Sequence, residues 1–411
     1  MNQNNQTFKH TAIGFIPPDW EVKKLREVTL GKGQYGINAS AVPFNENLPK
    51  YLRITDIDDD GYFSKDKLSS VDQTNSDEFF LKDDDIVFVR TGATTGKSYL
   101  YNKQDGQLVY AGFLIKFSVD TSVADKYFIW SFTKSSIYND WVSMYSQRSG
   151  QPGLNSYEYG NLVIPFPPLP EQQKIGEILK TWDKAISTTK EIINQLKIRN
   201  KSLAFNLLIG VKRLKEFEGI QNEKTLIKDI AKEISVKNKS DANHVVFSCT
   251  KHNGLVPSLQ YFGKQIYSED LTTYKVIKRN QFAYATNHIE EGSIGVLKDV
   301  EVGLISPMYT IFEFNSDVDL DYIFKLLKTN FYIYEYKRRM EGSIDRRGGL
   351  RWSEFSKIHV HLPALNEQKE IAKILNTANS ELELYQQKLN RLQTQKKGLM
   401  QQLLTGKVRT V

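Results

Sequence analysis

Two glycine-rich loops, at 147–155 and 342–352, carry the side chains best suited to bind a polar partner. An arginine can bond guanine through two hydrogen bonds, and a glutamine or asparagine can bond adenine in the same way. Glycine also lets a backbone approach a phosphate closely. Because the loops occupy equivalent positions of an internal repeat, we favour nucleic-acid binding over a solvated turn. The candidate residues are Arg148, Gln151, Asn155, Arg346, Arg347 and Arg351.

Further candidates lie in polar loops that follow or border apolar, strand-like runs. Some of them are expected to contact phosphates, which position a duplex without reading its sequence. These candidates are Arg90, Thr91, Thr94, Lys97, Thr250, Lys251, His252, Asn253, Asn287 and His288.

Motifs for catalysis or cofactor binding are weak. Residues 92–98 resemble a phosphate-binding loop but are one residue short of the required spacing. Asp19 and Glu21 are too close together in the chain to come from separate strands around a metal. His359 and His361 have no further histidine or cysteine spaced to complete a zinc site. We therefore expect no catalytic residue, no metal and no cofactor bound by this chain.

Composition sets broad limits on the class of protein. The 411 residues allow two or three domains, and the net charge of +7 mildly favours an acidic partner such as nucleic acid. The single cysteine, Cys249, excludes an internal disulfide and fits a reducing cytoplasm. The N-terminus is polar, and no apolar run approaches the roughly 20 residues that span a bilayer. We expect a cytoplasmic protein without a membrane span.

An internal repeat organises the chain. Residues 167–181 (PPLPEQQKIGEILKT) match 363–377 (PALNEQKEIAKILNT) at a constant offset of 196 residues. The offset still holds at 207–210 against 403–406, so no insertion has occurred over more than 40 residues. A continuous helix enforces this, since one inserted residue turns every later side chain by about 100°. The matched residues that we assign to spacing and partner contact are Glu171, Gln172, Ile175, Leu179, Glu367, Gln368, Ile371 and Leu375.

Apolar residues recur at alternating steps of four and three over 175–207 and 371–403. This heptad period predicts coiled-coil helices, the alternative being two ordinary amphipathic core helices. Asn200 and Lys396 interrupt the two seams at matching positions, where polar residues can fix register and partner number. Prolines precede and a glycine follows each segment, so each helix should have about 38 residues and a length of ~57 Å.

The segments before the helices predict two α+β modules with similar scaffolds and different loops. We place the modules at 1–166 and 214–362 and the helical spacers at 167–213 and 363–411. Strands are expected at 50–54, 86–89, 113–117, 245–247 and 310–312, and helices at 126–146 and 321–339.

These features resemble the specificity subunits of type I restriction–modification systems (the HsdS family). The resemblance is carried by the opening 16–25 (IPPDWEVKKL), by the repeated Pro–Leu–x–Glu–Gln pattern, and by long helices that end in Leu-Leu-x-Gly. Residues 248–257 and 282–296 also look like a recurring type of target recognition domain. The resemblance covers essentially the whole chain.

The resemblance implies an α+β fold with two tandem target recognition domains and two long antiparallel coiled-coil helices. Each domain would read one half of a split site in double-stranded DNA. The chain would dock two methyltransferase subunits, which bind S-adenosylmethionine and methylate adenine, and restriction subunits that use ATP and Mg²⁺. The contact residues named above are not implied by the resemblance, because these loops vary within the family.

Three alternatives stay open. The chain could be the specificity subunit of a fused restriction–methylation enzyme of the type IIB kind, which gene neighbours would reveal. It could be a coiled-coil scaffold whose modules bind protein, in which case DNA affinity would not fall with salt. It could also be an enzyme acting alone, which would methylate or cut DNA by itself.

Overall fold

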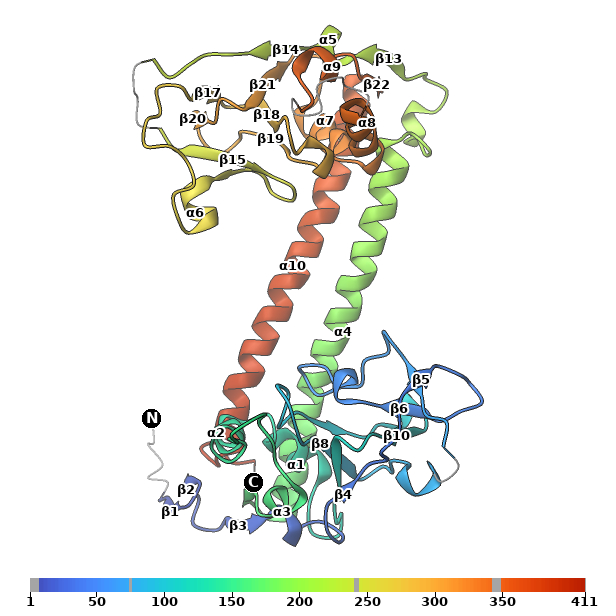
Figure 1. The fold of residues 1–411 in the computed structure, drawn as a ribbon, viewed down its shortest axis with the longest axis vertical. Coiled ribbons are helices and arrows are strands. Elements are labelled where there is room, and N and C mark those ends of the chain that lie inside the picture. Colours follow the sequence, from blue (N-terminus) through green and yellow to red (C-terminus); the bar gives the residue numbers. More distant parts are fainter. Residues whose placement is uncertain (1–6, 74–75, 240–243, 342–348, 411) are drawn as a thin grey trace. The chain divides into compact units, whose positions relative to one another are not determined.

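The computed structural model describes residues 7–73, 76–239, 244–341 and 349–410. The chain forms two compact units, one from Met1–Glu191 with Gln387–Val411 and the other from Ile192–Gln386. Each unit holds one α+β module and one half of each of two long helices (Figure 1). The fold class expected from the sequence is confirmed, although the first unit is completed by the C-terminal end of the chain.

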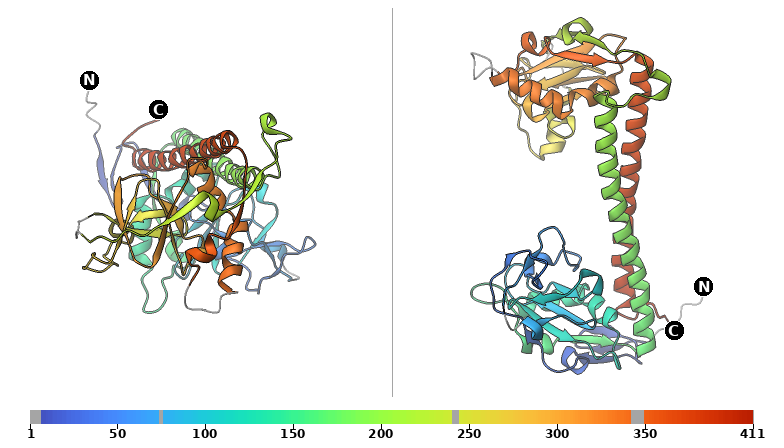
Figure 2. Two further views of the ribbon diagram at one scale, coloured as in Figure 1. Left: turned by 90° about the horizontal axis from the view of Figure 1, so that it is seen from above. Right: turned by 90° about the vertical axis from the view of Figure 1, so that its right-hand side faces the viewer.

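The long helices are α4 (Leu169–Leu208) and α10 (Leu365–Leu403), with 40 and 39 residues. Within each unit their halves lie side by side and antiparallel (Figure 2). Both helices start after proline and end near a glycine with positive φ, Gly210 or Gly406. The heptad period and the end signals of the sequence therefore predicted both helices to within a few residues.

In its described residues, the first module is built from short strands and three α-helices. Its strands are β1 (Lys9–Thr11), β2 (Gly14–Ile16), β3 (Glu21–Lys24), β4 (Gln34–Tyr35), β5 (Val42–Pro43), β6 (Lys50–Leu52), β7 (Ser69–Ser70), β8 (Asp85–Val89), β9 (Ser98–Leu100), β10 (Leu108–Tyr110), β11 (Leu114–Ser118) and β12 (Val163–Phe166). Its helices are α1 (Lys126–Phe132), α2 (Ser136–Tyr145) and α3 (Ser156–Gly160).

The second module has the same kinds of element in a similar order. Its strands are β13 (Glu223–Leu226), β14 (Ala231–Ile234), β15 (Val246–Thr250), β16 (Gly254–Pro257), β17 (Lys275–Lys278), β18 (Phe282–Ala285), β19 (Ile294–Val296), β20 (Val302–Ile305), β21 (Tyr309–Phe314) and β22 (His359–Leu362). Its helices are α5 (Ile227–Ile230), α6 (Ser258–Phe262), α7 (Leu320–Leu327), α8 (Asn330–Glu341) and α9 (Trp352–Phe355).

Sheet topology shows that the two modules are copies of one fold. One sheet has the order β4-β11-β8-β9 in the first module and β14-β21-β18-β19 in the second. In the other sheet, the parallel pair β6/β10 corresponds to the parallel pair β15/β20, and the antiparallel neighbour β7 corresponds to β16. Loops that join equivalent strands are therefore equivalent in space, even where their sequences share nothing.

The helices expected at 126–146 and 321–339 are each broken in two, and the single-helix prediction was wrong. In the first module the break lies at Thr133–Ser135, where the Ser135 hydroxyl accepts a hydrogen bond from the Tyr138 amide and starts a new helix. The expected strand at 50–54 also ends early, at Leu52, because a 3-10 turn follows it.

Each module completes its core with the long helices. In the first unit, Ile175 and Leu179 of α4 and Leu403 of α10 are buried in the same cluster as Trp20. In the second unit, the end of α4 and the start of α10 are buried in the module's cluster in the same way. Burial of this apolar surface fixes each module on a pair of helix ends.

Candidate nucleic-acid interface

In the first module, two of the sequence-predicted loops lie against each other. The Leu154 amide donates to the Arg90 carbonyl at 2.8 Å, and the Gly92 amide donates to the Pro152 carbonyl at 3.0 Å. The Thr95 hydroxyl also donates to the Pro152 carbonyl, at 3.2 Å. The β8–β9 loop and the loop at 147–155 therefore form one surface at this end of the module.

The candidates of the β8–β9 loop are half-buried and differ in what they contact. The guanidinium of Arg90 lies 4.8 Å from the ring centroid of Tyr35, and its Nε is buried without a hydrogen-bond partner. Thr91 and Thr94 are half-buried. The Lys97 ammonium pairs with the Asp59 carboxylate at 2.6 Å. Lys97 can reach a phosphate only by exchanging this carboxylate for it.

Two candidates of the loop at 147–155 hold the loop itself in shape. Arg148 pairs with Glu158 at 2.5 Å and donates to the carbonyls of Tyr145 and Gln147. The Asn155 side chain accepts from the Glu158 amide and caps α3. Base readout by Arg148 or Asn155 would require these bonds to break, whereas the side chain of Gln151 is exposed.

The second module repeats this arrangement. The Leu350 amide donates to the Thr286 carbonyl at 2.9 Å, which brings the β18–β19 loop to the segment before α9. A β carbon on Gly349, whose φ is +64°, would overlap the Asn287 Oδ1, so only glycine fits there. Arg351 is exposed at the start of α9. The remaining candidates of this loop, Arg346 and Arg347, lie outside the described residues.

The turn between β15 and β16 lies beside the β18–β19 loop, since a β carbon on Gly292 would lie 3.8 Å from the Lys251 carbonyl oxygen. The Thr250 hydroxyl donates to the Gly254 carbonyl and accepts from the Asn253 amide, both at 3.1 Å, and so shapes the turn. The side chains of Lys251, His252 and Asn253 are exposed. These predicted residues form a continuous polar tip.

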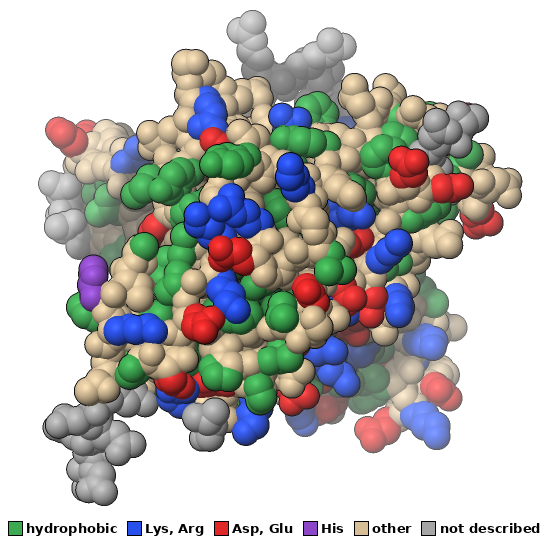
Figure 3. Space-filling model, turned by 90° about the horizontal axis from the view of Figure 1, so that it is seen from below, with side chains coloured by type: hydrophobic (Ala, Val, Ile, Leu, Met, Phe, Trp, Pro, Cys, Tyr) green, Lys and Arg blue, Asp and Glu red, His purple; other side chains and the backbone are tan. Residues whose placement is uncertain are grey.

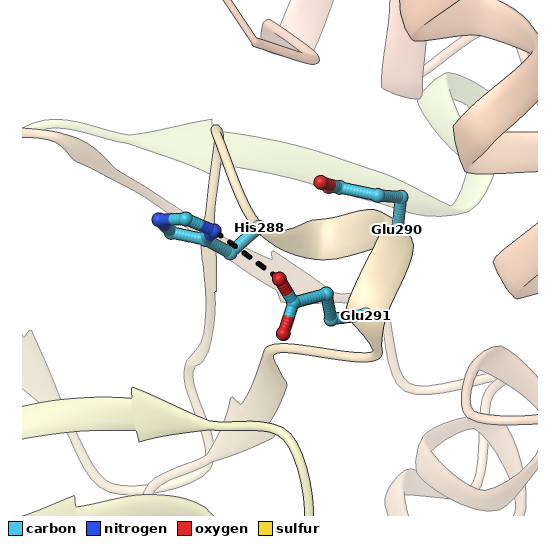
Figure 4. Close-up of side chains that lie close together, drawn as sticks. All are labelled: His288, Glu290 and Glu291. Atoms are coloured by element: carbon cyan, nitrogen blue, oxygen red, sulfur yellow. Dashed lines mark ion pairs between the residues drawn. The ribbon is translucent and has the colours of Figure 1, made fainter.

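The β18–β19 loop also groups His288 with two glutamates (Figure 4). The His288 Nδ1 lies 3.6 Å from the Glu291 carboxylate, and one possible ligand atom from each of His288, Glu290 and Glu291 lies within 4.8 Å of the others. Imidazole and carboxylate are ligands that a divalent cation can use. The sequence analysis did not foresee this group, because the two glutamates were taken as loop residues.

Sequence reasoning also missed a tight turn in the first module, which lies within the longer connection 53–68 between β6 and β7 and is called the β6–β7 turn below. Its tip is Asp58, Asp59, Asp60 and Gly61, and topology makes it the counterpart of the β15–β16 turn. The run of aspartates before glycine was a turn signal, but nothing local linked it to 250–253.

The residues assigned to spacing and partner contact are buried inside their own units, so they cannot form a docking surface. Glu171 accepts from Arg409 Nε at 2.8 Å and from Trp20 Nε1 at 3.0 Å. The Gln172 amide oxygen accepts from the Asp125 amide at 3.0 Å, and its nitrogen donates to the Pro167 carbonyl. The sequence assigned these side chains to partner contact as well as spacing; in the structure they attach the helix to its module.

The second copy uses the same contacts. Glu367 is completely buried and pairs with Arg213, the counterpart of Arg409. The Gln368 oxygen accepts from the Asp319 amide at 2.9 Å. The other buried members of both sets are Ile175, Leu179, Ile371 and Leu375. The Glu-Gln signature thus encodes the joint between module and helix.

The polar interruptions of the helix seams have different partners. In the first unit, the Lys396 ammonium pairs with the Asp183 carboxylate at 2.5 Å, and the Tyr127 hydroxyl donates to the same carboxylate. In the second, the Asn200 amide donates to the Ala378 carbonyl at 2.7 Å. These bonds can be made at one register only, which supports the predicted role in register.

One face of the molecule carries charged side chains of both signs. On the face in Figure 3, Lys and Arg side chains alternate with Asp, Glu and hydrophobic ones.

In the described part of the chain, no helix is both long and apolar enough to cross a membrane. β22 carries His359 and His361 on its exposed side, while Val360 and Leu362 are buried.

Comparison with known proteins gives a consistent result. The family model described as "Type I restriction modification DNA specificity domain" matches twice, at residues 17–198 and 209–394. The type I restriction enzyme MjaVIII specificity subunit of Methanocaldococcus jannaschii is 26% identical over 427 residues, which cover 98% of this chain and 96% of that protein.

Solved structures share the fold. The type I restriction–modification S subunit from M. genitalium has a TM-score of 0.58 at 14% identity and matches over 98% of both chains. The HsdS subunit from Thermoanaerobacter tengcongensis has a TM-score of 0.52 at 14% identity, over 96% of this chain and 98% of that one.

Proposed function

Because the chain belongs to the type I restriction modification DNA specificity domain family, we propose that each module reads one half of a bipartite DNA site. The observation that carries this proposal is the duplication of one surface. In each module a strand-joining turn, a second strand-joining loop and the residues directly before a short helix lie next to one another. Their sequences differ, so the two half-sites differ and the whole site is asymmetric.

The long helices set the gap between the half-sites. Each half of α4 is held against α10 by a polar contact that fits one register, Asp183–Lys396 in one unit and Asn200–Ala378 in the other. A coiled coil of fixed register is a spacer of fixed length, because each residue adds about 1.5 Å.

The chain itself acts without catalysis, and its partners supply the chemistry. Two methyltransferase subunits, which bind S-adenosylmethionine, dock on it and methylate adenine in the two half-sites. Restriction subunits that use ATP and Mg²⁺ complete the complex. A solved structure of similar fold concerns complex assembly and conformational transition of the type I restriction–modification system, which supports an assembly of this kind. Because the module-facing side of the helices is buried, we assign docking to their exposed faces.

Selection from a random duplex library tests this function. The chain, purified with its methyltransferase subunits, should enrich duplexes with two short fixed blocks separated by a constant number of free base pairs. Affinity for unrelated duplex should fall steeply with salt, since phosphate contacts release counterions. Enrichment of a single continuous block would contradict the proposal. So would the absence of any enriched sequence together with DNA affinity that does not change with salt, and this second result would favour a protein-binding scaffold.

A further inference from the structure

Each module holds a half-buried lysine at an equivalent place, just after α1 in the first module and just after α7 in the second. The Lys134 ammonium, after α1, lies 4.9 Å from the ring centroid of Trp130, and that of Lys328, after α7, lies 5.4 Å from the ring of Phe324. Both lysines therefore stand on an aromatic side chain four residues earlier. Burial lowers the pKa of both amines, that of Lys134 to about 7.

Both lysines lie under a turn. Lys328 Nζ donates to the Lys251 carbonyl at 2.8 Å, at the tip of the β15–β16 turn. Lys134 Nζ donates to the Ser98 carbonyl at 3.0 Å and lies so close to Gly61 that a β carbon there would overlap it. Each turn therefore lies against the equivalent lysine of its module, through a hydrogen bond to the Lys251 carbonyl in the second module and through close packing at Gly61 in the first.

The charges of the two turns are opposite. The tip of the first carries Asp58, Asp59 and Asp60, whereas the tip of the second carries Lys251, His252 and Asn253. Asp58 is committed to shape, because its Oδ1 accepts from the Asp60 and Tyr62 amides. Asp59 is almost fully exposed. One scaffold position therefore presents an acidic tip in one copy and a basic tip in the other.

The aspartates of the acidic tip form ion pairs with lysines that could otherwise bind a phosphate. Asp59 pairs with Lys97 of the β8–β9 loop, and Asp60 pairs with Lys190 of α4. Asp60 and both lysines line a cavity of about 830 Å³ in the first unit, so an anion can reach them. Because the carboxylate of each pair is exposed, the pairs contribute about 0–1 kcal/mol each, which makes the carboxylates exchangeable.

We propose that the β6–β7 and β15–β16 turns are equivalent DNA-facing elements, and that the acidic tip weakens phosphate binding by the first module while the basic tip strengthens it in the second. This inference rests on the proposed function. Phosphate contacts give affinity without sequence information. The first module would then depend mainly on contacts to bases, and the second would supply most of the sequence-independent affinity.

A salt series on an unrelated duplex tests the acidic tip. The full chain with its methyltransferase subunits is compared with its D59N/D60N variant, which frees Lys97 and Lys190. If each lysine gains one phosphate, the slope of log K against log salt steepens by about 1.8, and affinity near 0.1 M salt rises at least several-fold. The control is D77N/E78Q, which removes two adjacent exposed carboxylates elsewhere in the first module.

The basic tip gives the opposite test. K251Q should make the slope shallower by about 0.9, whereas K264Q, which removes an exposed lysine outside the turn, should change it less. Equal effects of turn and control variants would mean that only net charge matters and would overturn the inference. A wild-type complex without salt-dependent DNA affinity would instead overturn the proposed function.

Discussion

Replacing Arg409 with methionine should destabilise the first unit, because it strands the buried carboxylate of Glu171. That carboxylate has no solvent exposure and accepts hydrogen bonds from two Arg409 nitrogens, at 2.8 and 2.9 Å, and from Trp20. Methionine keeps part of the packing of the arginine stem but removes both charged donors. The donors that remain, the Trp20 indole N–H at 3.0 Å and the Thr410 backbone amide at 3.4 Å, are neutral and cannot balance the buried charge.

The expected cost is about 3 kcal/mol, the lower end of the range for breaking a buried ion pair, because the Arg409 side chain is 20% exposed. For a unit of this size, that corresponds to a fall in Tm of roughly 6–12 °C. The additional Arg409 pair with Asp19 adds little, since Asp19 is half-exposed.

A double-mutant cycle measured by thermal unfolding separates the ion pair from simple loss of packing. R409M/E171Q should recover most of the loss, because glutamine is neutral and still accepts from Trp20. R213M should have the same effect in the second unit, where Arg213 holds Glu367. The control K103M removes an exposed pair with Asp83 and should change the unfolding free energy by less than about 1 kcal/mol.

Two results would refute this reasoning: R409M costing no more than K103M, or E171Q failing to rescue R409M. Either result would mean that the C-terminal end does not hold Glu171 in place. The Glu-Gln signature would then need another explanation.

Further predictions concern pH, spacing and specificity. Burial and the nearby Lys396 lower the folded pKa of Lys134 to about 7, against the opposing pull of Asp58, Asp60 and Asp183. The unfolded chain therefore binds more protons above pH 7, and the Tm of the wild type should rise from about pH 7 to 9 relative to K134M; parallel pH curves would contradict this. Inserting one heptad into both α4 and α10, between the two seam contacts, should lengthen the DNA gap and leave both half-sites unchanged, and an unaltered gap in the methylated site would sink the spacer role. Replacing Arg351 by glutamine should relax one half-site only, by roughly 1–3 kcal/mol in competition binding; an equal loss on all sequences would identify a phosphate contact instead.

The sequence predicted the long helices well because their signals are local and repeated. The heptad period, the prolines before each start and the glycines after each end all point to the same segments. The constant offset of 196 residues added a second, independent constraint. Neither depends on which distant residues pack together.

Contacts between distant segments were harder to predict. The break at Thr133–Ser135 interrupts a continuous aromatic pattern, and only the Ser135 cap marks it. Burial of Glu171 depends on Arg409, which is 238 residues away. The polar side chains of the repeated signature were therefore taken for a partner surface, although they close the unit.

Loop candidates were predicted by composition, which says which side chains can bind DNA but not which are free to do so. Arg148 and Asn155 have suitable chemistry, yet both are used to shape their loop. The acidic tip at 58–60 has the opposite charge to a DNA-binding loop, so composition excluded it. Its equivalence to 251–253 became visible only through the order of strands in the two sheets.

Genome-wide mapping of methylated adenines can show whether each module reads its own half-site. The host carries the partner subunits with the wild-type chain, with no chain, or with R351Q. We predict one asymmetric bipartite motif that appears only with the chain. With R351Q, one half of the motif should become degenerate while the other half and the gap stay the same. Changes in both halves, or a motif that persists without the chain, would contradict the assignment of one half-site to each module.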